Sequence, residues 1–157
     1  MRHGELEIQL PDGWTDQSTL LFQGPPESAS RPTLSRIADS NPTVSVRFFH
    51  REAADPREIL AEELRQLQEL DPDCTLQTQG PITSELGEGW HIVHRTGEEQ
   101  GPIQQLLACF CLPKTVILAC AQSHAHSFSA TEPVLREILS SLAARATPSP
   151  PQTREGA

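Results

Sequence analysis

The chain opens on an alternation of polar and apolar residues that predicts a β-strand. Residues 5–10, Glu-Leu-Glu-Ile-Gln-Leu, have the two-residue period of a strand with one buried face. A Pro-Asp-Gly turn ends this segment. Segments bounded by Gly or Pro and rich in strand-forming residues predict further strands at residues 18–23, 43–49, 74–85 (with a break at Gly80 and Pro81), 89–96, 103–112 and 115–122.

Two segments have the spacing of apolar residues that is typical of amphipathic helices. The first begins after Asp55, which can cap the helix ahead of a proline at the first helical position, and it ends at Asp71. The second is expected at residues 129–144, with Ser129 and Glu132 forming a capping box. The apolar stripes are Ile59, Leu60, Leu64 and Leu67 in the first helix, and Val134, Leu135, Ile138, Leu139 and Leu142 in the second.

The order of these elements is strands, helix, strands, helix, without the strict alternation of strand and helix found in parallel sheets. We therefore predict an α+β fold, with a mainly antiparallel sheet of six or seven strands and two packed helices. Residues 1–145 are predicted to form a single domain, and residues 146–157 a disordered proline-rich tail. The proline-rich segment 24–42 is long for a connection inside a domain, which indicates a loop that is mobile or contacts a partner.

Charge and composition exclude several functional classes. The 157 residues include 21 acidic and 12 basic ones, a net charge of −9, which disfavours binding to nucleic acids and to anionic membranes. No segment approaches the ~20 apolar residues that cross a bilayer. The N-terminus has no signal-peptide pattern, so we expect a cytoplasmic protein whose four cysteines are free thiols.

Cysteine and histidine residues near the end of the predicted sheet are candidates for chemistry. Cys109, Cys111 and Cys120, with His124 and His126, could supply metal ligands, but a Cys-x-Cys pair inside an apolar strand is a poor zinc knuckle. We interpret these cysteines as small core residues. Another histidine pair, at positions 91 and 94, should point to opposite faces of one strand. No nucleophile, phosphate-binding or metalloprotease motif is present, so we expect no enzymatic activity, cofactor or metal.

Two predicted strands are apolar on both faces, whereas a strand in a sheet with one solvated face should alternate polar and apolar residues. These are residues 105–112 and 116–121. One explanation is that one helix covers each face of the sheet. The other is that both helices pack on one face and leave an apolar trough for a second subunit or a ligand helix.

A resemblance to a known family rests mainly on residues 6–22. Here an amphipathic strand is followed by Pro-x-x-Trp-x-Asp and a strand ending near Phe, which this chain matches with Pro11, Trp14, Asp16 and Phe22. The sequence resembles the DcrB-like proteins, and among them the Eag-type chaperones of type VI secretion effectors. Further similarities are an apolar strand ending in Arg51, a Gly-x-x-x-Gln hairpin at residues 101–107 and the terminal helix, so that the resemblance spans about residues 5–144.

The resemblance implies a PsbP-like fold and a homodimer whose concave sheet face shelters apolar N-terminal helices of a secreted effector. Under this hypothesis one sheet face binds a helix. The sequence does not show which of the two faces this is, and on the other face Leu106 would take the place of Leu107. Trp14 should be a buried packing anchor. The alternative is a PsbP-like interaction module, as in Ran-binding import factors, that binds an unrelated protein through a surface patch. The residues expected to line the helix-binding face are Phe22, Val46, Phe48, Gln105, Leu107 and Cys109.

Overall fold

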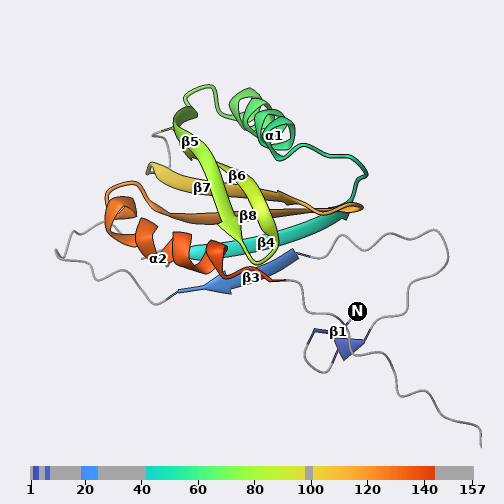
Figure 1. The fold of residues 1–157 in the computed structure, drawn as a ribbon. Helices are drawn as coiled ribbons and strands as arrows, with labels where there is room; N and C mark the ends of the chain where they lie inside the picture. Colours follow the sequence, from blue (N-terminus) through green and yellow to red (C-terminus); the bar gives the residue numbers. More distant parts are fainter. Residues whose placement is uncertain (1, 4–5, 8–18, 25–41, 98–100, 144–157) are drawn as a thin grey trace, which may run out of the picture.

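A six-stranded antiparallel sheet lies between two helices (Figure 1). The computed structural model describes residues 2–3, 6–7, 19–24, 42–97 and 101–143. The predicted α+β class with a mainly antiparallel sheet is therefore confirmed. In spatial order, the strands are β3 (Thr19–Gln23), β4 (Thr43–His50), β8 (Thr115–His124), β7 (Ile103–Cys111), β6 (Gly87–Arg95) and β5 (Thr75–Ser84), and a separate pair is formed by β1 (Arg2–His3) and β2 (Leu6–Glu7).

The chain crosses the whole sheet once. After β4 it passes through helix α1 (Pro56–Leu70) to β5 at the opposite edge. It then returns by hairpins through β6 and β7 to β8, which pairs with β4 over eight residues. Helix α2 (Phe128–Ser140) follows β8. This crossover places α1 over the middle strands β6 and β7.

Helix α1 begins where the sequence predicted. Asp55 is the N-cap, and its carboxylate accepts a hydrogen bond of 2.7 Å from the backbone N–H of Arg57. The helix ends at the cap residue Asp71, whose backbone N–H donates to the carbonyl of Leu67. A second link holds this end, because the Asp71 carboxylate accepts a hydrogen bond of 2.7 Å from the backbone N–H of Gly97.

Helix α2 begins differently from the prediction. Ser127 is the N-cap residue, and its side chain makes no capping hydrogen bond to the helix. The predicted capping box is therefore wrong. Ser129 lies inside the helix, and the Glu132 carboxylate pairs instead with Arg136, one turn later, at 2.7 Å. The helix starts at Phe128 because this side chain is buried in the core.

The predicted break at Gly80 and Pro81 is also absent. β5 continues through Gly80 and Pro81 and stays paired with β6. Because β5 is an edge strand, Pro81 can occupy it without removing a hydrogen bond from a second neighbour.

Each face of the sheet has its own apolar core, covered by its own helix. Ile59 and Leu60 of α1 pack with Leu107 and Leu118 on one face. On the other face, the α2 residues Phe128, Leu135 and Leu139 pack with core residues of the sheet that include Val46 and Leu106. The hypothesis that both helices share one face is therefore wrong, and the apolar character of both faces of β7 and β8 is explained by the helix on each side. None of the helices in the described part of the chain is long and apolar enough to cross a membrane.

Candidate functional site

An apolar groove lies beside α1, over the strands β5 and β6. Helix α1 packs on β6 and β7, and the edge strand β5 forms the far side of the groove. The volume of the groove is about 320 Å³. Its apolar lining residues are Leu60, Ala61, Leu64, Leu76, Trp90 and Ile92, and its polar ones are Arg57, Arg65, Gln68 and Gln79.

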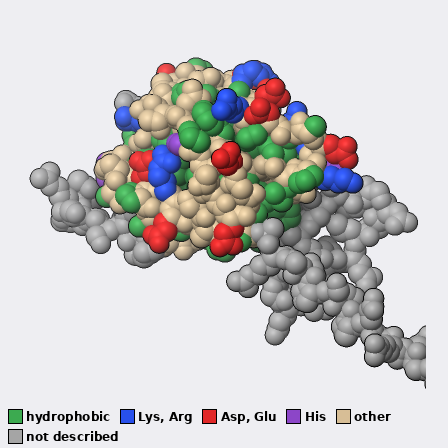
Figure 2. Space-filling view, in the orientation of Figure 1, with side chains coloured by type: hydrophobic (Ala, Val, Ile, Leu, Met, Phe, Trp, Pro, Cys, Tyr) green, Lys and Arg blue, Asp and Glu red, His purple; other side chains and the backbone are tan. Residues whose placement is uncertain are grey.

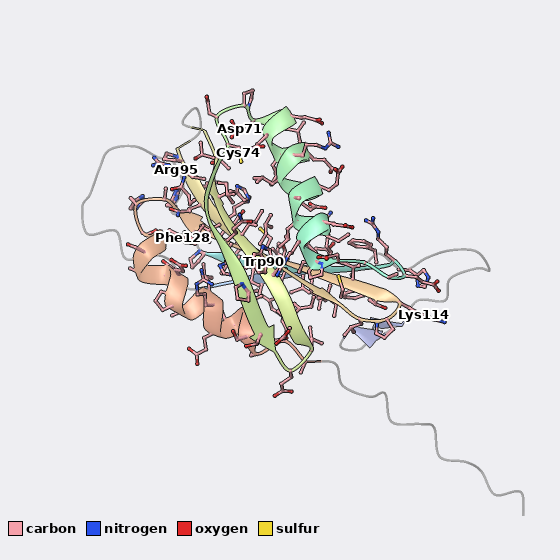
Figure 3. The ribbon with its side chains drawn as sticks, turned by 45° about the horizontal axis from the view of Figure 1, so that its top comes forward. Asp71, Cys74, Trp90, Arg95, Lys114 and Phe128 are labelled. Atoms are coloured by element: carbon pink, nitrogen blue, oxygen red, sulfur yellow. The ribbon has the colours of Figure 1, made fainter. Side chains whose placement is uncertain are left out.

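The floor of the groove comes from alternate residues of β6. Trp90 and Ile92 are two residues apart in an extended strand, so their side chains lie on the same face. Ile92 is buried, whereas Trp90 is half-buried. The guanidinium carbon of Arg57 lies 4.3 Å from the centroid of the Trp90 ring. Figure 3 shows Trp90 near the N-terminal end of α1, with Asp71 and Cys74 at the other end.

On the helix side of the groove, a small residue, Ala61, lies next to two leucines and leaves space for a partner. Leu60 and Leu64 are one turn apart, and Leu60 is fully buried in the core beneath α1. Ala61 is exposed, and its methyl group leaves room above the floor. On the opposite side, Leu76 of β5 is 39% exposed. Apolar surface is therefore available to a partner from both walls.

The charges that line the groove are positive, although the protein is acidic. Arg65 hydrogen bonds to Glu62 at 2.7 Å and to Glu69. The hydrogen bond from Arg65 holds the pKa of Glu62 well below its usual range, at about 2. Arg57 has no carboxylate partner among the residues that the structure describes. Figure 2 shows charged side chains of both signs among apolar ones on the upper part of the molecule, where α1 lies.

A buried histidine and a buried cysteine lie near the C-terminal end of α1. Nδ1 of His94 is 3.4 Å from Sγ of Cys74, and Nε2 of His94 is buried without a hydrogen-bond partner among the residues that the structure describes. Burial lowers the pKa of His94 and raises the pKa of Cys74, so burial favours the neutral form of both groups. A reactive thiolate needs the opposite environment. This pair is therefore poorly arranged for nucleophilic catalysis.

The second predicted histidine lies on the other face of β6. Nε2 of His91 is 3.2 Å from Nη2 of Arg136 on α2, whereas His94 shares the face of Ile92 under α1. Burial and the positive charge of Arg136 lower the pKa of His91. The two histidines thus cannot act on one atom, as the sequence predicted.

The cysteines of β7 are packing residues. Cys109 is fully buried beneath α1, and its Sγ atom lies 4.0 Å from that of Cys111 without a disulfide bond. Burial raises the pKa of the Cys109 thiol far above its usual range. Within the described ranges, no three His, Cys, Asp or Glu side chains are arranged to hold a metal ion.

The six residues predicted to line one helix-binding face do not share a face. Val46 lies in the core under α2, and Phe22 and Phe48 have the same strand parity. Leu107 and Cys109 lie in the core under α1. The predicted single binding face is therefore wrong. Phe22 is 56% exposed on the edge strand β3, Phe48 is half-buried, and Gln105 donates a hydrogen bond of 2.6 Å to Gln122.

Sequence reasoning identified Leu60 and Leu64 as part of an apolar helix stripe, but it missed the other residues that form the groove. Leu76 is an apolar residue among polar ones in Thr-Leu-Gln-Thr-Gln, and its strand lies at an edge. This isolated leucine was the available signal. Arg57 and Ala61 carried none, because their role depends on how α1 lies relative to β5. The predictions for Trp14, the loop 24–42 and the tail 146–157 concern residues that lie largely or wholly outside the described part of the chain.

Comparison with known proteins identifies a similar fold. No family model and no curated protein matches the chain. A crystal structure of PA94 from Pseudomonas aeruginosa, a protein of unknown function described as a candidate regulator, is similar over 94% of this chain and 96% of its own, with a TM-score of 0.70 and 16% identity. LpqN of Mycobacterium tuberculosis, described as involved in cell envelope biogenesis, is less similar, with a TM-score of 0.46 and 13% identity over 76% of this chain and 79% of its own. The first similarity supports the fold and leaves the function open.

Proposed function

We propose that this protein is a non-catalytic binding module that holds an apolar segment of another protein in the groove beside α1. The observation that carries the proposal is the apolar lining of this groove, in which Leu76 and Trp90 remain accessible. Removing apolar surface from water contributes about 25 cal/mol per Å². Binding would therefore need neither a cofactor nor a covalent step.

The size of the groove limits what it holds. Its volume of about 320 Å³ is at the lower end of the range for ligand pockets, roughly 300–1,000 Å³. It fits one or two apolar side chains rather than a whole helix. The partner would thus anchor such side chains in the groove and leave the rest of its segment on the surface of α1 and β5.

The finer proposal is that the partner is a type VI secretion effector, and that the protein is a cytoplasmic chaperone or adaptor for its apolar N-terminal helices. The resemblance of residues 6–22 to Eag-type chaperones supports this assignment. The proposal includes a homodimer, in which a second copy would enlarge the apolar surface. Leu21 and Phe22, which are 70% and 56% exposed on the edge strand β3, are available for such a contact.

A second candidate function is a PsbP-like interaction module with an unrelated protein partner. The outer flank of α2 favours it, because Val134 and Ile138 are 56% and 41% exposed one turn apart on this helix. These two residues could form a surface patch on the face opposite the groove. A partner bound there would be unaffected by changes in α1.

Co-expression with two carrier proteins tests the proposed function. One carrier has an N-terminal helix of about 20 Leu and Ala residues, the length of a membrane-type segment. The other has a polar helix of the same length. We expect the affinity-tagged protein to co-purify with the first carrier only. Equal recovery of both carriers, or of neither, would contradict the proposal.

A further inference from the structure

Arg57, at one end of the apolar groove, has no carboxylate partner within the described ranges. Its backbone N–H is bound to the Asp55 carboxylate, and its guanidinium group lies over the Trp90 ring, 4.3 Å from the centroid. This contact with the ring is attractive and holds the side chain at the groove. The side chain of Arg57 is exposed, so these donors are accessible to a partner.

Two other arginines near α1 pair with carboxylates. Arg65 is paired with two glutamates, and Arg47 pairs with Glu63 at 2.5 Å on the other side of the helix. None of the described residues that line the groove is acidic. Among the described lining residues, Arg57 is therefore a positive charge without a carboxylate partner, in a protein whose net charge is −9.

The net negative charge of the protein does not cancel the effect of the Arg57 charge on a nearby anion. At physiological ionic strength, charges separated by more than about 8 Å are largely screened. An anion in contact with Arg57 therefore responds mainly to the guanidinium group and to the carboxylates of Asp55 and Glu58 beside it. The positive end of the α1 dipole is also nearby, although Asp55 and Glu58 in the first turn offset it.

We propose that the partner segment carries an Asp or Glu side chain about one helical turn from its apolar anchor, and that this carboxylate binds Arg57 while the anchor occupies the groove. This inference rests on the proposed function and adds the chemistry of the partner. Residues three or four apart lie side by side on a helix, so one helix face can present both groups. A planar guanidinium group held over a ring is suited to bind a carboxylate through two parallel hydrogen bonds.

Two labelled peptides test the inference by fluorescence anisotropy. Both are amphipathic helices, acetylated and amidated so that no terminal charge competes, with two leucines one turn apart. The Glu peptide has a glutamate one helical turn from the leucine pair, and it is made in two versions, with the glutamate on the N-terminal or the C-terminal side of the pair. In each matching Gln peptide, glutamine replaces this glutamate. The wild-type protein should bind the Glu peptide about fivefold more tightly than the Gln peptide, a ratio expected for a partly exposed ion pair.

Three variants test whether Arg57 is responsible for the preference for the Glu peptide. Arg57→Gln should bring the ratio of the two dissociation constants close to one, whereas Lys114→Gln, which removes the same charge at an exposed site at the β7–β8 turn, should keep it. Arg57→Lys should retain part of the preference, and added salt should reduce it.

The outcomes separate this inference from the proposed function. If wild type binds both peptides equally, or if the preference persists in Arg57→Gln, the role of Arg57 is wrong and the apolar groove stands. If neither peptide binds, both proposals fail. A preference lost equally in Lys114→Gln would show a general effect of net charge and would also overturn the role of Arg57.

Discussion

Nδ1 of His94 lies 3.4 Å from Sγ of Cys74, and both side chains are buried near the C-terminal end of α1. Gln68 of the helix reaches the same point, donating a hydrogen bond of 3.3 Å to the backbone carbonyl of Cys74. The C-terminal end of α1 is thus linked through Cys74 to a buried histidine. The stability of this region should depend on the protonation of His94.

Stability should fall as the pH is lowered below neutral. Burial lowers the pKa of His94 and of His91, whereas the unfolded chain has ordinary histidine pKa values of about 6.5. Below this value the unfolded state binds more protons than the folded state, so the free energy of unfolding decreases. The slope reaches at most about 1.4 kcal/mol per pH unit for each histidine. The loss should begin near pH 6.5 and continue down to the lowered pKa values.

Urea unfolding between pH 5 and 8 measures this dependence. His94→Leu should make the profile less steep because one titrating group is removed. His50→Gln, at an exposed position on β4, should keep the wild-type slope. A wild-type slope in the His94→Leu variant would show that His94 does not titrate as its burial requires.

The substitution Leu107→Arg should unfold the protein rather than selectively abolish binding. The sequence predicted a binding role for Leu107, but the side chain is only 6% exposed beneath α1. A charge there lacks a partner, and the expected loss of stability is on the order of 4 kcal/mol. Leu70→Arg is the matched control, because Leu70 is 85% exposed at the end of α1. Chemical denaturation that finds the two variants equally stable would place Leu107 outside the core.

Gly89→Ala should destabilise the β6–β7 pair. A Cβ atom at this position would lie 2.3 Å from the backbone carbonyl oxygen of Cys109 and 2.7 Å from Cδ1 of Phe110. Since the strand must shift, we expect a loss of about 1–3 kcal/mol. Gly80→Ala is the control, because its Cβ would meet Cε1 of His91 at 3.4 Å, an ordinary contact. Equal thermal midpoints for both variants would contradict the close approach at Gly89.

The four thiols should differ in their rates of alkylation. Cys74 and Cys109 are buried, whereas Cys111 and Cys120 are partly exposed. Burial also raises the pKa of Cys120, to about 12, so even this thiol should react slowly near neutral pH. Mass spectrometry should count four alkylated cysteines after unfolding without a reductant. A lower count would reveal a disulfide bond or another modification.

Local chemistry made part of the fold predictable. Asp55 and the proline after it define the start of α1 through a cap that involves only neighbouring residues. The predicted ends of β5, β6, β7 and β8 were close to those observed because glycine or proline stands at or next to each turn between these strands. The start of α2 was misplaced because a capping motif at Ser129 was preferred over the burial of Phe128, which depends on contacts with the sheet.

The candidate site could not be predicted in the same way. In β7, Leu106 and Leu107 are both apolar, so the sequence does not show that the first faces α2 and the second faces α1. The groove depends on the position of α1 relative to β5, a tertiary relationship with no local signature. Its residues, such as Arg57 and Trp90, are brought together from a helix and a strand far apart in the sequence.

The affinity of the Glu peptide for variants of α1 tests the central claim most directly. Ala61→Phe fills the groove from an exposed position without removing a core contact, and Gln66→Phe adds the same side chain on the exposed surface of α1 away from the groove. Fluorescence anisotropy should show at least about tenfold weaker binding for Ala61→Phe, since the apolar anchor is displaced, and wild-type affinity for Gln66→Phe. Equal affinities for the two folded variants would contradict a binding site in the groove beside α1.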